Sequence, residues 1–186
     1  MSAVTYSLWL KPTGRAYEVL VRTIRELAHE LGAPLFEPHV TLLGQLEGTE
    51  QAHVRRCEEL AGQLQPFQIT LIDPSYRSEY FQCLFMRVQQ TPAAMSAHAL
   101  ARRVFHRPED TYMPHLSLLY GLFPDRRKRE VIDRLQPDVR TSFEVGAFHL
   151  IRAGSDDPKD WHEIAVFCVA GQEPAAGRLR PAPAAD

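Results

Sequence analysis

The feature that most constrains this chain is a short pattern that occurs twice. Pro38-His39-Val40-Thr41-Leu42-Leu43 returns as Pro114-His115-Leu116-Ser117-Leu118-Leu119, at a spacing of 115 minus 39, or 76 residues. Side chains alternate between the two faces of an extended strand, so an imidazole and a hydroxyl two positions apart share one face, at about 6.6 Å. The pattern predicts two strands that each present one His and one hydroxyl on one face and aliphatic side chains on the other.

A single match of this kind carries little weight. In a chain with 8 His, roughly 0.7 His-x-Ser/Thr pairs are expected by chance. The ordinary alternative is a pair of half-buried strands whose histidines make only local hydrogen bonds. Two matches that share the preceding Pro and the following Leu-Leu favour a common site, in which the two strands surround a small anion.

Composition narrows the class of protein. A chain of 186 residues, with 45% hydrophobic and 24% charged residues, is typical of a soluble globular protein. The formal net charge of -2 provides no field suited to a long nucleic acid, so a small phosphate ester is the better ligand. No segment resembles a leader or a membrane span, and we expect a cytoplasmic monomer. Cys57, Cys83 and Cys168 lack the spacing of a zinc site and are expected to be buried free thiols.

Hydrophobic periodicity indicates that strands and helices alternate along the chain. Strands are expected at 5–10, 35–43, 67–72, 80–88, 113–119, 142–151 and 162–169, and helices at 15–31, 50–64, 92–106 and 124–135. His53 is expected to be a solvated residue of the second of these helices. The polar loop Gly154–Asp160 joins two strands and is a candidate border of the site, although an ordinary solvated connection explains it equally well.

The same order of elements occurs in both halves, at 5–72 and 80–151. This repeat predicts an α+β protein with two lobes related by a pseudo-twofold axis and a site in the cleft between them. We assign residues 1–170 to one such domain. Residues 171–186 are rich in Ala, Pro and Gly, and we expect a disordered tail there.

The chain resembles the 2H phosphoesterase superfamily over about residues 5 to 169, since that superfamily carries two His-x-Thr/Ser motifs at this spacing. It is most similar to the cyclic phosphodiesterase branch of plants and fungi. Besides the two motifs, the resemblance rests on Tyr6-Ser7-Leu8-Trp9, Phe81-Gln82-Cys83, Tyr112-Met113 and Trp161-His162-Glu163. It implies concave antiparallel sheets with helices outside. It also implies hydrolysis of nucleoside 2′,3′-cyclic phosphates, of ADP-ribose 1″,2″-cyclic phosphate or of both, to phosphomonoesters.

Opening a cyclic phosphodiester requires a base for the attacking water and an acid for the departing ribose oxygen. Two imidazoles of opposite protonation supply both, and His39 and His115 are the predicted pair. The hydroxyls of Thr41 and Ser117 are predicted to hold the charged phosphoryl oxygens, without a metal or another cofactor. Either His can be the base at this stage.

Three aromatic residues are candidate contacts of the substrate. Trp9 and Tyr112 are candidates for the base or sugar, although aromatic side chains on strands most often belong to the core. Strict alternation places Tyr120 on the face opposite Ser117. The resemblance implies that Tyr120 nevertheless reaches the phosphate, which requires the strand to end or bulge before Gly121.

Three alternatives remain open. One is an enzyme of RNA ends that forms or opens 2′,5′ linkages; in that branch an Arg usually follows the second motif, whereas Leu118-Leu119-Tyr120-Gly121 follows it here. Another is a nucleotide-binding module without activity, which both complete motifs disfavour. The last is a metalloprotein built on the 8 His, which lack the paired spacings of such sites.

Overall fold

Eight strands form one antiparallel sheet in the order β6-β3-β4-β5-β2-β1-β7-β8. The computed structural model describes residues 4–171. The strands are β1 (Thr5–Leu10), β2 (Val40–Leu46), β3 (Phe67–Tyr76), β4 (Leu84–Val88), β5 (His115–Leu119), β6 (Ser142–Val145), β7 (Ala147–Ala153) and β8 (Trp161–Cys168). The helices are α1 (Gly14–Leu31), α2 (Glu50–Gln63), α3 (Pro92–Val104) and α4 (Asp125–Arg134).

The two His strands lie side by side at the centre of the sheet. β2 and β5 pair only at Val40 and Leu116, each of which directly follows a motif His. Outward from this centre the order is symmetric, because β1 and β4 flank the His strands and β7 and β3 follow. A late strand of each half therefore pairs with the first strand of the other half, as β3 with β4 and β7 with β1. The expected pseudo-twofold α+β fold is confirmed, with halves that interlock.

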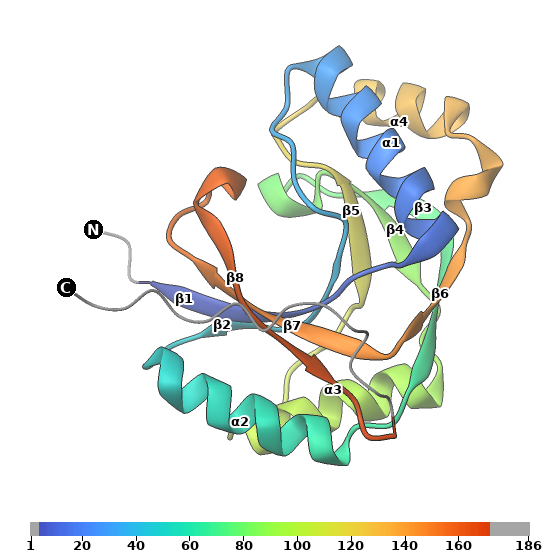
Figure 1. The fold of residues 1–186 in the computed structure, drawn as a ribbon. Coiled ribbons are helices and arrows are strands. Elements are labelled where there is room, and N and C mark those ends of the chain that lie inside the picture. The colour runs from blue at the N-terminus through green and yellow to red at the C-terminus, as the bar shows by residue number, and fades with distance from the viewer. Residues whose placement is uncertain (1–3, 172–186) are drawn as a thin grey trace.

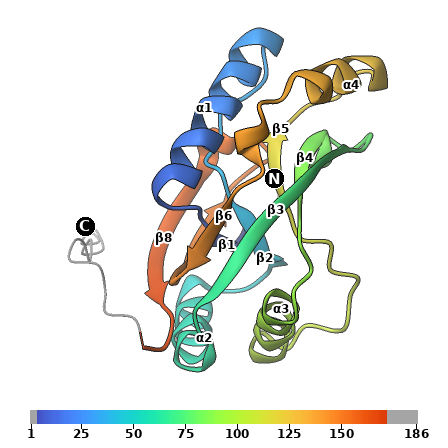
Figure 2. The same cartoon turned by 90° about the vertical axis from the view of Figure 1, so that its right-hand side faces the viewer.

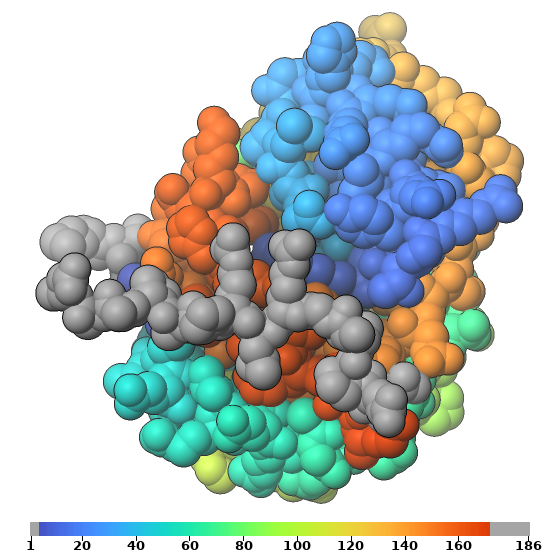
Figure 3. All heavy atoms as spheres, viewed as in Figure 1, coloured from blue at the N-terminus to red at the C-terminus, as the bar shows by residue number. Residues whose placement is uncertain are grey.

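Helices cover the curled sheet from outside, as expected. Figure 1 shows α1 and α4 above the sheet and α2 and α3 below it, and Figure 2 shows the same two pairs from the side. In the space-filling view of Figure 3, α1 in blue and α2 in teal form opposite ends of the visible face. The halves also interlock through the helices, since α1 packs on β5 and α3 packs on β2. This packing holds the two His strands together although they share little backbone pairing.

Local sequence explains where the helices begin and end. Thr49 and Thr91 precede α2 and α3, and their side chains accept hydrogen bonds from the backbone N–H groups of Ala52 and Ala94. Helix α1 ends at Gly32, whose φ of 62° is a left-handed conformation that glycine adopts without strain.

Several expected boundaries are wrong. The strand expected at 35–43 begins at Val40 and continues through Gly44 to Leu46, because Pro34 and Pro38 remove N–H donors before it. The strand expected at 80–88 begins at Leu84, after a short 3₁₀ turn at Tyr80–Gln82. The strand expected at 142–151 is two strands, because β6 pairs with β3 and β7 pairs with β1, at different parts of the sheet.

The expectation for His53 is also wrong. Its side chain is 1% exposed and packs against the rings of Tyr6 and Phe105. Positions 53, 57 and 60 form the buried stripe of α2, so helical periodicity overrides the polarity of this residue.

The three cysteines are free, with Cys57 and Cys83 buried and Cys168 partly buried. Within residues 4–171, no helix has the length and apolar character needed to cross a membrane. The tail expected at 171–186 lies, apart from Gly171, outside the described residues.

Candidate active site

A cavity of about 440 Å³ lies where the two His strands meet, and His39, Thr41, His115 and Ser117 all line it. We call it the central cavity. Each motif occupies the same local framework, because Thr41 pairs with Trp9 of β1 and Ser117 pairs with Phe85 of β4. These neighbours are also separated by 85 minus 9, or 76 residues, as the two histidines are. The duplication thus extends beyond the motifs to the strands that support them.

Both imidazoles are oriented by the same backbone contact. The Nδ1 atom of His39 lies 2.7 Å from the carbonyl oxygen of Glu37, and the Nδ1 atom of His115 lies 3.0 Å from that of Met113. A carbonyl oxygen only accepts, so Nδ1–H is the donor in both cases. In the neutral ring this leaves Nε2 without a proton and available as a base.

Burial makes the charged form of both imidazoles unfavourable. It lowers the pKa of His39 to about 3, and the nearby His115 adds a smaller effect in the same direction. Burial also lowers the pKa of His115, with a further contribution from the positive charge of Arg77. Two imidazolium ions side by side would repel each other. A phosphate anion between the rings would favour protonation of one of them.

The environments of the two imidazoles differ. The indole of Trp9 stacks on His39, with ring centroids 3.5 Å apart and planes 4° from parallel. His115 instead meets Phe85 at 5.1 Å and 64°. Trp9 was a candidate base or sugar contact. It lines the central cavity but is only 6% exposed, and its ring stacks on His39.

The two motif hydroxyls are also unequal. Ser117 is 6% exposed, and its hydroxyl donates to the carbonyl oxygen of Phe81 at 2.8 Å. Thr41 is half-buried, and its own carbonyl oxygen accepts a hydrogen bond from the hydroxyl of Tyr112 at 2.9 Å. To donate to a phosphate, the hydroxyl of Ser117 must turn away from Phe81.

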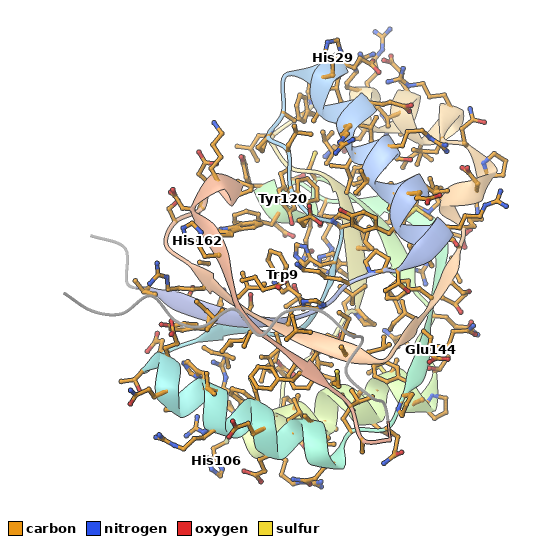
Figure 4. All side chains as sticks on the ribbon, in the orientation of Figure 1. Trp9, His29, His106, Tyr120, Glu144 and His162 are labelled. Atoms are coloured by element: carbon orange, nitrogen blue, oxygen red, sulfur yellow. The ribbon has the colours of Figure 1, made fainter. Side chains whose placement is uncertain are left out.

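Tyr120 lines the central cavity and Tyr112 does not. Strand β5 ends at Leu119, so the alternation that would turn Tyr120 away no longer applies. Its ring stacks on Phe36 at 3.8 Å, and burial raises the pKa of its hydroxyl. Figure 4 shows Trp9 and Tyr120 in the middle of the molecule. Tyr112 lies in an adjoining cavity, stacked on His98 at 3.8 Å.

Sequence reasoning assigned no role to two aromatic residues of the site, Phe81 and Trp161. The indole of Trp161 donates to the carbonyl oxygen of Ser155 at 2.8 Å and meets Trp9 edge-on at 5.5 Å. Phe81 lines the same cavity. Both residues lie in segments on which the family resemblance rests, and this was the sequence feature that could have pointed to a role in the site. The loop expected to border the site does so through residues 154–156.

The charged side chains that line the central cavity, apart from the histidines, are acidic. Glu47 and Asp156 line it, whereas no Lys or Arg of the described residues does. Within 4–171, no group of three or more His, Cys, Asp or Glu side chains is placed to hold a metal ion. The site therefore offers two imidazoles, several hydroxyls and an aromatic wall as its chemical groups.

Comparisons with known proteins place the chain among related sequences and folds. Residues 12–157 match the family described as the 2′-5′ RNA ligase superfamily. The chain is 27% identical to a cyclic phosphodiesterase of Arabidopsis thaliana over 168 residues, which cover 87% of this chain and 93% of that protein. It is 26% identical to a 2′,3′-cyclic-nucleotide 3′-phosphodiesterase of Yarrowia lipolytica, over 85% of this chain and 96% of that protein. The crystal structure of E. coli LigT in its apo form shares the fold, with a TM-score of 0.64 at 15% identity over 90% of this chain and 99% of that one.

Proposed function

The chain belongs to the 2′-5′ RNA ligase superfamily, and on that premise we propose that it is a metal-independent cyclic phosphodiesterase. Its substrates are nucleoside 2′,3′-cyclic phosphates, ADP-ribose 1″,2″-cyclic phosphate or both, and its products are phosphomonoesters. The names of the Arabidopsis and Yarrowia relatives support this substrate class. The proposal rests mainly on one observation: two imidazoles line one cavity, and each has Nδ1 bound to a carbonyl oxygen and Nε2 left available.

In the proposed reaction, His39 is the base and His115 is the acid. His39 is the more deeply buried ring and is stacked on Trp9, so protonation is less favourable there than at His115. Its Nε2 takes a proton from water as the water oxygen bonds to phosphorus. The bond from phosphorus to one ribose oxygen breaks, and that oxygen takes a proton from Nε2 of His115. The product is a phosphomonoester with a free ribose hydroxyl.

Hydroxyl donors are proposed to carry the charge of the phosphoryl oxygens. Thr41 and Ser117 follow their histidines by two residues and line the same cavity. Tyr120 adds a hydroxyl that stays protonated, because burial raises its pKa. No Lys or Arg of the described residues lines this cavity, so its hydrogen-bond donors are neutral. Such donors stabilise negative charge mainly where that charge increases during the reaction.

Product analysis tests the proposal. The purified protein is incubated with 2′,3′-cyclic AMP and with ADP-ribose 1″,2″-cyclic phosphate, and phosphorus NMR follows the conversion of the cyclic diester to a monoester. The position of the monoester shows which ester bond breaks. If neither compound is opened, this substrate class is wrong. Formation of a 2′,5′ bond between RNA ends would favour the ligase alternative instead.

A further inference from the structure

A second cavity, of about 390 Å³, adjoins the central cavity. Thr41, Gly44 and His115 line both, so a molecule whose phosphate lies between the histidines can extend from one into the other. We call this second space the side cavity. The residues of its lining that matter here are Arg77, Gln82, Arg107, Asp110 and Met113.

The two cavities have opposite charge. The central cavity has Glu47 and Asp156 in its lining, and the side cavity has Arg77 and Arg107. The acidic residue of the side cavity, Asp110, is already engaged by His98 at 2.9 Å and lies 3.8 Å from Arg102. A further negative charge on a substrate is therefore stabilised on the side of the arginines and repelled at the acidic side.

Arg77 is held in position before any ligand arrives. Its guanidinium donates to Oε1 of Gln82 at 3.0 Å and contacts Sδ of Met113 at 3.3 Å. Its carbonyl oxygen accepts a hydrogen bond of 2.8 Å from Nζ of Lys128, a side chain only 2% exposed. Its nearest carboxylate, that of Glu79, is 3.8 Å away and 65% exposed. An arginine fixed in this way loses little conformational entropy when it binds an anion.

Arg107 connects the side cavity to the central one. Its Nη1 donates to the carbonyl oxygen of Gln45 at 2.6 Å. Gln45 lines the central cavity and has a φ of 52°, which is a strained conformation for a residue other than glycine. Only part of the donor fork of Arg107 is used in this contact, so further N–H groups remain for a ligand.

We propose that the side cavity binds a second phosphate group of the substrate, beyond the cyclic phosphate that reacts. That group is the phosphodiester of an oligonucleotide ending in a 2′,3′-cyclic phosphate, or the pyrophosphate of an ADP-ribose derivative. Arg77 and Arg107 recognise it through charge-assisted, bidentate hydrogen bonds. The inference rests on the proposed function, since the reacting phosphate must first lie between His39 and His115.

The test compares substrates with and without the second phosphate. We would measure kcat/KM for 2′,3′-cyclic AMP, for a diadenosine dinucleotide ending in a 2′,3′-cyclic phosphate, and for ADP-ribose 1″,2″-cyclic phosphate. The proteins are wild type, Arg77→Gln, Arg107→Gln and the control Arg126→Gln. Arg126 has a side chain 88% exposed on α4, lines neither cavity, and its replacement removes the same charge.

The informative quantity is the ratio of kcat/KM for each longer substrate to that for 2′,3′-cyclic AMP. For the favoured longer substrate, Arg77→Gln and Arg107→Gln should each lower this ratio by about tenfold, chiefly through KM, and Arg126→Gln should not change it. Whichever substrate shows the loss identifies the source of the second phosphate. Unchanged ratios in both variants, or an equal loss on all three substrates, would overturn the inference. A wild-type protein that opens none of the three would instead overturn the proposed function.

Discussion

The indole of Trp9 lies flat against the imidazole of His39, with ring centroids 3.5 Å apart. The residue equivalent to Trp9 beside His115 is Phe85, whose ring lies 5.1 Å away and is tilted by 64° rather than stacked. Two sites that the duplication made similar thus differ in how closely an aromatic ring covers each imidazole. We attribute to this difference the separate roles proposed for His39 as base and His115 as acid.

Replacing Trp9 should change the pH dependence of the reaction. Trp9→Phe removes part of the surface that keeps water from His39, so the pKa of His39 should rise and the acidic limb of kcat/KM should move to higher pH. Phe85→Leu is the matched variant, and it should move the alkaline limb to higher pH by raising the pKa of His115. A pH profile of each variant measures both limbs. Identical profiles in the two variants would contradict separate roles.

The motif hydroxyls should affect the binding of simple anions. Thr41→Val and Ser117→Ala should each weaken inhibition by inorganic phosphate by about ten- to hundredfold, since a hydrogen bond to a charged group contributes about 1.5–3 kcal/mol. Catalysis should fall with it. Ser142→Ala is the control, because this exposed hydroxyl bonds to Thr70 at 3.0 Å at the β3–β6 pairing. Unchanged inhibition constants in both motif variants would place the phosphate elsewhere.

The buried His53 should make folding sensitive to acid. Neither ring nitrogen has a hydrogen-bond partner among residues 4–171, and burial lowers the pKa of this imidazole below its usual 6.5. The unfolded chain therefore binds a proton more readily than the folded one. The corresponding stability is complete above about pH 6.5 and is lost as the pH falls toward the lowered pKa.

Urea unfolding at pH 5 and pH 8 measures this effect. His53→Leu removes the titrating group, so it should stabilise the protein more at pH 5 than at pH 8. His39 and His115 also have lowered pKa values, and they add to the acid sensitivity of both proteins equally. An equal difference between wild type and variant at the two pH values would show that His53 does not carry the effect.

Without any added metal, activity should depend on pH in two directions. The reaction requires His39 neutral and His115 protonated, and their pKa values are lowered to about 3 and to below 6.5. We therefore expect kcat/KM to peak between these values, while kcat peaks at higher pH because a bound phosphate anion favours imidazolium. Dialysis against EDTA should leave activity intact. Activity restored only by a divalent ion, with a single rise with pH, would indicate a metal-bound water.

The grouping of the four motif residues in one cavity was predictable because each motif is local in sequence. His39 with Thr41 and His115 with Ser117 are two residues apart, and alternation along a strand alone brings each pair to one face. The exchange of β3 and β7 between halves is a long-range pairing that periodicity does not specify. Phe81 lies just before β4 and Trp161 begins β8, and both reach the cavity through long-range strand pairings of this kind, which is why their roles were missed.

The prediction that His53 is solvated was wrong for a different reason. A polar residue on a helix is usually exposed, and here the stripe formed with Cys57 and Leu60 buries it. For Tyr120, strict alternation predicted a side chain that points away from the site, and the structure places it in the cavity. Its side chain enters the cavity only because β5 ends at Leu119, a boundary that the apolar run of the strand does not indicate.

The most direct test of the paired mechanism is the kcat/KM of His39→Ala, His115→Ala and the double variant on 2′,3′-cyclic AMP. His29→Ala is the control, because this exposed side chain lies at the outer end of α1 (Figure 4). Each single variant should lose at least about a hundredfold, and the double variant little more, because the two groups act in one step. A folded single variant that retains nearly wild-type kcat/KM would contradict the account.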